Sequence, residues 1–342
     1  MKKIICITVF IGGVFLGSSQ NNAVGIYPTA ILACDYCLLT RGFSPLEIIP
    51  GFGVRVDARY TVLNSVFTGT NQVTNHVGEK ETHFTTQLTM FYNFSQEFTV
   101  LGILPIPKRS VSLSPGDTHS HDENVEEGSD HGPVHRHNAS GSSFNFGDLN
   151  ILARYTFLKL NTFKQSTAVA LEAGVKIPTG KTDALDQTGN FLDAHIQAGT
   201  GSWNFLIGFS LNHINKYFGL SSNLLYSINT TGEAGNDDYR YGNWLNGDIT
   251  VKYQMFASEM NKRHFYLTLG INGEFRGKEE INSQAIENTG GEVLYVAPGI
   301  QFMVSPVITL EASFQYPFYH NLNGEEQLGE DLKTFFGINY LL

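Results

Sequence analysis

The chain has 342 residues, of which 42% are hydrophobic, 16% charged and 12% aromatic, and its formal net charge is −10. An acidic chain is not attracted to polyanions, so the composition argues against nucleic acid as a partner. Outside the N-terminal region, no apolar run approaches the roughly 18 residues that a membrane-spanning helix needs.

The N-terminal region has the pattern of a secretory signal peptide. Lys2 and Lys3 precede an apolar run over residues 4–16, and small and polar residues follow. The run is too short to span a bilayer, so the sequence favours a cleaved signal over residues 1–25 rather than a membrane anchor.

The segment that follows, residues 26–47, shows no clear periodicity. We predict that it is a periplasmic lead-in or a piece inserted into the lumen of the protein. It contains Cys34 and Cys37 as a Cys-x-x-Cys pair. In an exported protein, such a pair is expected to form a local disulfide or to remain as two unpaired thiols. A redox-active or metal-binding pair is less favoured, since no thioredoxin-like pattern surrounds the motif.

From residue 48 to residue 342 the chain alternates apolar and polar residues, as membrane strands do. The alternation is clear in most segments and weak in the second and third, where Pro105 and Pro107 are predicted to break the strand. The predicted strands are 51–62, 84–94, 98–106, 148–157, 169–177, 203–211, 218–228, 245–255, 265–276, 293–304, 308–316 and 331–342.

These twelve strands predict an all-β, membrane-spanning, antiparallel up-and-down β-barrel. The number is even, and the connections alternate between long loops and short turns, as in bacterial outer-membrane barrels with both termini in the periplasm. A soluble β-sandwich also alternates, but it would not place so many aromatic residues on one parity and the charges on the other.

The last strand is predicted to close the barrel on the first one. Phe336, Ile338, Tyr340 and Leu342 share the apolar parity, while Phe335 and Leu341 are exceptions on the other parity. Closure removes the unpaired edge that a bilayer would penalise. The expected partners are outer-membrane lipid and, through this C-terminal strand, the barrel-assembly machinery.

Charged residues gather on the inward parity, with seven cations and six anions. Such a balance fits a wet pore with charges paired across strands, and it also fits an interior filled by salt bridges. The residues predicted to line a pore are Arg55, Asp57, Arg59, Arg154, Glu172, Lys176, Lys252, Glu274, Arg276 and Glu311.

A polar loop over residues 108–143 is predicted to be disordered, and its part 117–138 is rich in histidine. It contains five of the eleven histidines of the chain, among six carboxylates: His119, His121, His131, His135 and His137. Imidazole binds Zn, Cu and Ni, so weak metal capture at the cell surface is one hypothesis. A solvated loop with no metal is the other. No other cofactor is expected.

Three blocks of sequence resemble a known family. They are Gly-Asp-Leu-Asn-Ile-Leu-Ala-Arg-Tyr at 147–155, Gly-Val-Lys-Ile-Pro-Thr-Gly-Lys-Thr-Asp at 174–183 and Gln-Ala-Gly-Thr-Gly-Ser-Trp-Asn-Phe at 197–205. Together the blocks resemble the exported barrel family named for the meta-pathway of phenol degradation. The resemblance implies an outer-membrane channel for small solutes, including hydrophobic or aromatic compounds. The His-rich loop is not part of this pattern.

The sequence therefore predicts a channel or transporter of small solutes, with a surface metal-binding barrel as the alternative. An outer-membrane lipase or acyltransferase would need a nucleophile with a base in reach. Five histidines outside the loop offer bases without a recognisable serine partner: His83, His195, His213, His264 and His320. We expect no catalytic residues.

Overall fold

The computed structural model describes residues 51–76, 78–113, 140–162, 165–186, 189–215, 217–235, 237–258 and 263–342. The predicted signal peptide, the lead-in 26–47, Cys34, Cys37 and the five loop histidines lie outside these residues. Within the described ranges, no helix combines the length and the apolar character needed to cross a bilayer.

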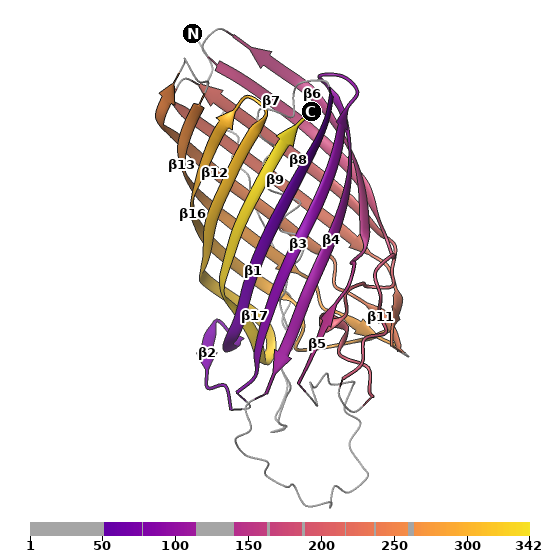
Figure 1. Ribbon diagram of the computed structural model, residues 1–342. Helices are drawn as coiled ribbons and strands as arrows, with labels where there is room; N and C mark the ends of the chain where they lie inside the picture. Colours follow the sequence, from indigo (N-terminus) through magenta and orange to yellow (C-terminus); the bar gives the residue numbers. More distant parts are fainter. Residues whose placement is uncertain are drawn as a thin grey trace, which may run out of the picture.

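The described chain forms one closed antiparallel barrel with tilted strands (Figure 1). The main sheet has 13 strands, and two of them, β2 and β5, are short additions at one end, which leaves eleven in the ring. The strands of the ring are β1 (Gly51–Gly69), β3 (Lys80–Asn93), β4 (Phe98–Ser112), β6 (Leu149–Asn161), β7 (Gln165–Ile177), β8 (Asn204–Asn215), β9 (Phe218–Asn229), β12 (Trp244–Ser258), β13 (Arg263–Arg276), β16 (Gly291–Ser305) and β17 (Ile308–Leu341).

Strand β17 crosses the barrel twice, and this confirms the predicted twelve passages. Its first half pairs with β16 and its second half with β1. Leu322 pairs with both neighbours, and the chain reverses just after it, where Gly324 and Glu326 have φ values of 69° and 53°. The predicted closure of the last strand on the first is therefore present, with Gly53 opposite Leu341 and Val62 opposite Leu332.

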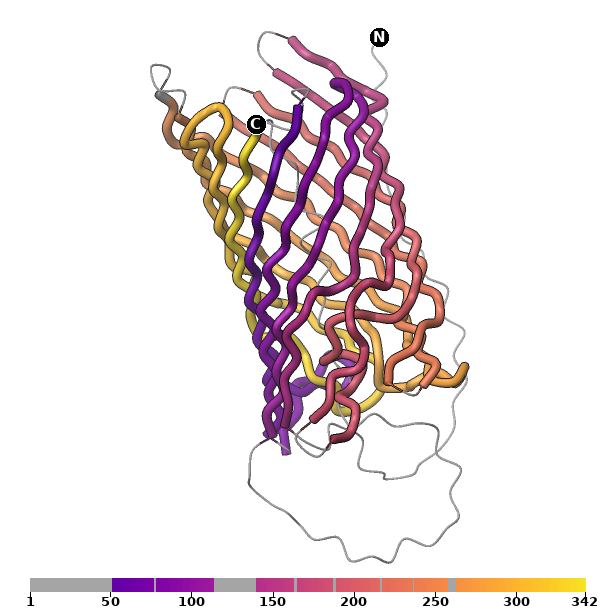
Figure 2. Tube along the Cα trace, turned by 45° about the vertical axis from the view of Figure 1, so that its right-hand side comes forward, coloured from indigo at the N-terminus to yellow at the C-terminus, as the bar shows by residue number. Residues whose placement is uncertain are grey.

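The two ends of the barrel differ. One end, here called the turn end, has the short connections and the C-terminus; the other, the loop end, has the long connections (Figures 1 and 2). The small elements of the loop end are β2 (Asn71–Val73), β5 (Gly141–Phe144), the 3₁₀ helix η3 (Ala194–Ile196), and a separate sheet of β10 (Gly232–Ala234), β11 (Asp237–Arg240), β14 (Glu280–Ile281) and β15 (Gln284–Ala285).

Strand β4 corrects two expectations. It continues through Pro105 and Pro107 to Ser112, so residues 108–112, like 141–143 of β5, belong to strands rather than to the His-rich loop. The prolines are tolerated because the polar backbone atoms of both face away from β3: their oxygens accept from Gly147 N at 2.8 Å and Asn145 N at 3.4 Å. A missing N–H there removes no bond to β3.

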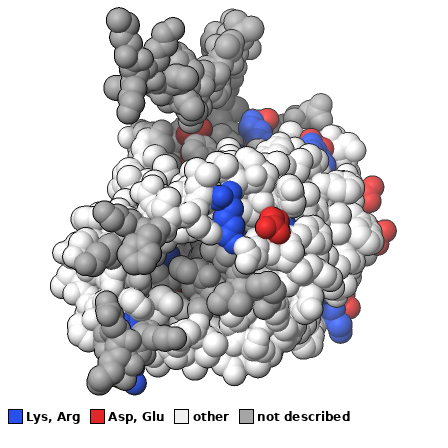
Figure 3. Space-filling model, turned by 90° about the horizontal axis from the view of Figure 1, so that it is seen from above, with Lys and Arg blue, Asp and Glu red and all other residues white. Residues whose placement is uncertain are grey.

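The outward parity is apolar and exposed, as lipid contact requires. Seen from the turn end, most of the outer surface is uncharged (Figure 3). The exposed residues on this face include Tyr60, Phe84, Tyr155, Phe205, Tyr226, Ile249, Leu269, Phe314, Phe336 and Tyr340.

Candidate functional site

All ten residues predicted to line a pore lie on the inner face of the barrel. Seven are buried and three are partly buried, and the structure brings most of them into pairs. The buried ones are Arg55, Asp57, Arg59, Arg154, Glu172, Lys176 and Glu274, and the partly buried ones are Lys252, Arg276 and Glu311.

One side of the lumen, formed by β1, β13, β16 and β17, is a dense network of charges that we call the charge-paired wall. At its turn end, Arg55 Nε lies 2.9 Å from Asp57 Oδ1, and Arg55 Nη2 lies 3.2 Å from Glu311 Oε2. Because each charge has an opposite charge in contact, the wall avoids the cost of burying an isolated ion.

At the loop end of the same wall, Lys333 lies between two carboxylates. Its Nζ contacts Glu274 Oε1 and lies 2.5 Å from Glu330 Oε2. The ammonium also lies 4.4 Å from the ring centroid of Tyr295, whose hydroxyl donates to Glu330. Arg276 Nη2 lies 3.8 Å from Glu274 Oε2. Lys333 is not among the ten residues predicted to line a pore, although it is buried on the same inner face.

The other side of the lumen, from β3 round to β12, has an apolar row that starts at the turn end of the charge-paired wall, with Leu341 of β17. Six large apolar side chains lie on one line of register partners, on which Gly53, Gly174 and Ser227 occupy the positions of β1, β7 and β9. All six are at most 5% exposed: Leu341, Phe91, Leu101, Leu152, Leu206 and Trp244. They pack into one cluster with Ile103 and Leu225. Because the strands are tilted, a row of register partners winds along the barrel from the turn end toward the loop end.

Small residues in the row make room for the large ones. Gly53 lies between Leu341 and Phe91 in the register, and Gly174 lies between Leu152 and Leu206. A Cβ at Gly53 would overlap the ring of Phe91, and one at Gly174 would lie 2.8 Å from Leu152 Cγ. The row is therefore a closely packed part of the inner wall, and its packing requires glycine at positions 53 and 174.

The three sequence blocks that suggested a family meet at Asp148. Its Oδ1 accepts from Gly180 N at 2.9 Å, and its Oδ2 accepts from Thr200 N at 2.9 Å and lies 3.1 Å from Lys176 Nζ. Gly180 and Gly199 allow a close backbone approach at this point, since a Cβ at Gly180 would lie 2.6 Å from Gly199 Cα. The blocks thus tie the loop 178–203 to the start of β6.

Beyond this anchor, the loop 178–203 joins a cap at the loop end. His195 Nε2 of η3 lies 2.9 Å from Glu279 Oε2, and Tyr239 of β11 donates to the same carboxylate. We call His195, Tyr239 and Glu279 the cap cluster. Arg109 of β4 donates to the backbone oxygens of His195 at 2.8 Å and Gln197 at 2.6 Å, which fastens the cap to the barrel wall.

Charge governs the protonation of the cap cluster. Burial alone would lower the pKa of His195, but the Glu279 carboxylate, with contributions from Asp193 and Glu81, outweighs burial and raises it. Burial and the same carboxylate raise the pKa of Tyr239 well above its usual value, so the phenol keeps its proton. The contact with Glu279 therefore favours the protonated form of the His195 imidazole.

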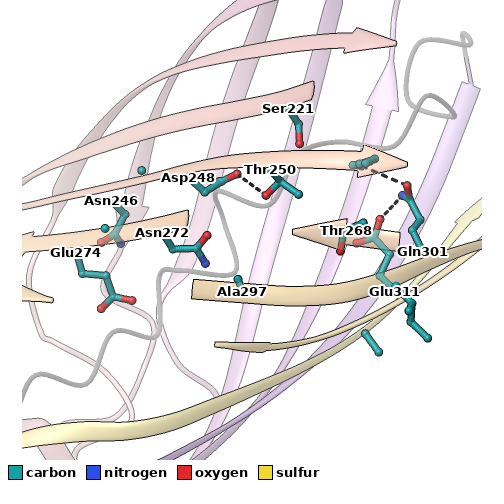
Figure 4. Close-up of a pocket in the computed structure, with 15 residues that line it drawn as sticks. Ser221, Asn246, Asp248, Thr250, Thr268, Asn272, Glu274, Ala297, Gln301 and Glu311 are labelled. Carbon is teal, nitrogen blue, oxygen red and sulfur yellow. Dashed lines mark hydrogen bonds between the residues drawn. The ribbon is translucent and has the colours of Figure 1, made fainter. Parts of the chain in front are cut away.

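Three cavities open between the described side chains of the lumen. Two adjoin in the half nearer the turn end, since both are lined by Ser221, Lys252 and Gln301; their volumes are about 140 and about 50 Å³. In the smaller one, polar side chains of β9, β12 and β13 face a common space (Figure 4). The third, of about 70 Å³, lies under the cap cluster beside Trp244.

The histidines considered as bases have other partners. Their hydrogen-bond partners are Glu81 for His83, Thr167 for His213, Gln254 for His264 and the backbone oxygen of Glu330 for His320, while His195 belongs to the cap cluster. In the described ranges, no group of three or more His, Cys, Asp and Glu side chains is arranged to hold a metal ion. The metal prediction for the His-rich loop stays a prediction.

The fold is that of an outer-membrane β-barrel. One solved structure, the COG4313 outer membrane channel from Pseudomonas putida F1, aligns over 86% of this chain and 96% of its own, with a TM-score of 0.62 and 13% identity. The β domain of the Bordetella autotransporter BrkA is less similar, with a TM-score of 0.45 and 10% identity over 85% of this chain and 100% of its own. At such identities the likeness shows the fold alone.

The sequence itself identifies the family. Residues 116–325, more than half of the chain, match the model of the family described as "Putative MetA-pathway of phenol degradation". The chain belongs to this family, which confirms the resemblance drawn from the three blocks. No curated protein matches the sequence.

Proposed function

We propose that this protein is a passive channel that carries small solutes across the outer membrane through its lumen. The proposal is supported by the closed barrel with an apolar outside and by the cavities between its inner side chains. The turn end faces the periplasm, as short connections do in bacterial barrels.

We further propose that the preferred solutes are small hydrophobic or aromatic compounds. The observation that carries this proposal is the apolar row, because an inner wall for sugars or ions alone would not need six large apolar side chains in register. A solute with an aromatic ring gains about 25 cal/mol for each Å² of apolar surface that it buries against such a row. The reference to phenol in the family description agrees with this solute class.

Single-channel recording in planar bilayers tests both parts of the proposal. The purified full chain should give stepwise currents in KCl. Benzyl alcohol, a neutral aromatic probe, should interrupt these currents at millimolar concentrations, whereas glycerol at the same concentration should not. A protein that inserts but never conducts would overturn the channel proposal. Equal effects of benzyl alcohol and glycerol would overturn the solute class.

A further inference from the structure

The largest of the three lumen cavities lies on the turn-end side of the apolar row. Its volume is about 140 Å³. An engineered apolar cavity of about 150 Å³ in another protein binds benzene, so this space accepts one aromatic ring. Ala168, Tyr266 and Met303 give the cavity apolar walls, and Met303 packs against the cluster that contains the row. The cavity is therefore continuous with the proposed path of the solute.

Basic side chains from two strands line the same cavity. Arg154 and Lys159 extend from β6, and Lys252 extends from β12. Among the described residues that line it, there is no Asp or Glu. Glu172 Oε1 lies 3.9 Å from Arg154 Nε, but Glu172 does not line the cavity. The lining therefore has a positive balance.

The contacts of Lys159 leave N–H donors for an anion. Its Nζ donates to Gln96 Oε1 at 2.9 Å, whereas the bond from Lys252 Nζ to Gln301 Oε1, at 3.2 Å, is one of several contacts of that ammonium group. An ammonium group has three N–H donors, so a bond to a neutral amide is compatible with a second bond to an anionic oxygen. Hydrogen bonds between charged groups are about twice as strong as those between neutral groups, so an anion would be the better acceptor.

The other two cavities do not share this balance. The central one is lined by Asp248, Glu274 and Glu311 beside Lys252, and the one under the cap by Asp148 and Glu279 beside Arg109 and Arg276. An anion would meet carboxylates in both. Within the described lumen, the turn-end cavity is thus the one that combines basic side chains with a large apolar lining.

We propose that the turn-end cavity is a binding site for a small aromatic anion, a ring that bears one carboxylate or phenolate oxygen. The anionic oxygen binds at Lys252, Lys159 and Arg154, and the ring lies against the apolar lining. This inference rests on the proposed function and specifies its solute: an aromatic compound that is bound most tightly in its ionised form, near the periplasmic end of the channel.

Calorimetric titration of the full chain in detergent with benzoate and with benzamide tests the site. The two probes have nearly the same shape, and only benzoate is charged at pH 7.5. Benzoate should bind about tenfold more tightly than benzamide, because an ion pair in a partly solvated site is worth on the order of a tenfold change in affinity. Equal affinities, or no benzoate binding at millimolar concentration, would overturn the inference.

Variants then locate the site. In Lys159→Gln/Lys252→Gln, the advantage of benzoate over benzamide should largely disappear, since only Arg154 remains of the three basic side chains. Lys278→Gln removes one positive charge from an exposed loop at the other end of the barrel and should leave it unchanged. If the double variant does not fold, as judged by heat-modifiable migration in gels, Lys252→Gln alone should reduce the advantage about threefold. An advantage that persists in every folded variant refutes this location.

The same samples separate this inference from the proposed function. Recording in KCl reports conduction without any aromatic anion. If the protein conducts KCl but binds benzoate no better than benzamide, the channel proposal stands and the proposal of an anion site is overturned. If the protein binds benzoate through Lys252 but never conducts, the anion site stands and the channel proposal is overturned.

Discussion

The two sides of the lumen satisfy the same requirement by different chemistry. The charge-paired wall fills its space with ions that neutralise one another, whereas the apolar row fills its space with side chains that have no polar atoms to satisfy. Ion networks of this kind are rigid and intolerant of a lost partner. Apolar side chains tolerate exchange for others of similar volume and leave the lumen wall chemically neutral. Under the proposed function, the first side gives structural support and the second contacts the solute.

The largest effect should come from breaking the charge-paired wall. Lys333→Met leaves Glu274 and Glu330 buried beside each other without their shared cation, and such changes cost about 3–5 kcal/mol. Urea unfolding in lipid vesicles, followed by tryptophan fluorescence, measures this loss. Lys278→Met removes a cation from the exposed pair with Glu287 and should cost less than about 1 kcal/mol. Similar losses of unfolding free energy in both variants would show that the charge-paired wall is no more sensitive to a lost cation than an exposed ion pair is.

A steric change in the apolar row should have the next largest effect. Gly53→Ala puts a methyl group where the ring of Phe91 lies. Overpacking of this kind costs about 1–3 kcal/mol. The double variant Gly53→Ala/Phe91→Leu should recover much of the loss in the same urea assay, since the smaller side chain vacates the space. No recovery would show that the cost has another source.

A polarity change in the row should alter solute contact. Leu152→Gln and Leu152→Met both keep roughly the volume of the side chain, but only the first removes apolar contact area. We expect the benzyl alcohol interruptions in bilayer recordings to shorten about fivefold in Leu152→Gln, on the order of 1 kcal/mol. They should stay nearly unchanged in Leu152→Met. If the interruptions last equally long in both variants, the solute does not contact the apolar row.

The smallest effect should appear in the cap, which links the two sides of the lumen. The pKa of His195 is raised in the folded protein, so the ion pair with Glu279 stabilises the cap fully below the unfolded pKa of about 6.5. This stabilisation is lost as the pH rises through the raised value. Hydrogen exchange at residues 194–197, corrected for the intrinsic dependence on pH, should therefore quicken a few-fold from pH 6 to pH 9.

The control for this titration is His195→Gln, which keeps a hydrogen-bonding side chain and removes the charge. The corrected exchange rate in this variant should not depend on pH over the same range. Glu279, Asp193, Glu81, Tyr239, Tyr241 and Arg109 also face or surround the imidazole. A pH dependence that survives in His195→Gln would therefore belong to one of these groups.

Much of the fold could be predicted because lipid outside and polar groups inside impose a period of two on every strand. The twelve passages, the closing pairing and the inner position of all ten predicted side chains follow from that rule. The apolar row did not, although its signal was present: 84–94 and 98–106 alternate weakly because Phe91, Leu101 and Ile103 put apolar groups on the inward parity. Weak alternation in a barrel strand can therefore indicate an apolar inner face.

The cap could not be predicted for a different reason. His195, Tyr239 and Glu279 come from three separate connections between the strands of the ring. Their meeting depends on the backbone path after β7, which Asp148 fixes through Gly180 and Thr200. Nothing in local periodicity reports such a contact. The prediction that the prolines break β4 failed for a similar reason. Whether a strand tolerates proline depends on which neighbouring strand the polar backbone atoms of the proline face, and local sequence does not report this.

The pairing of β1 with the second half of β17 has a consequence for the order of events during folding. The two strands of this seam are separated by nearly the whole described chain, from Gly53 to Leu341. Their bonds cannot form before both segments have been synthesised and exported, and contacts between such distant segments form slowly. Until then, two unsatisfied strand edges persist, so the immature polypeptide needs shelter from self-association while the cylinder is incomplete.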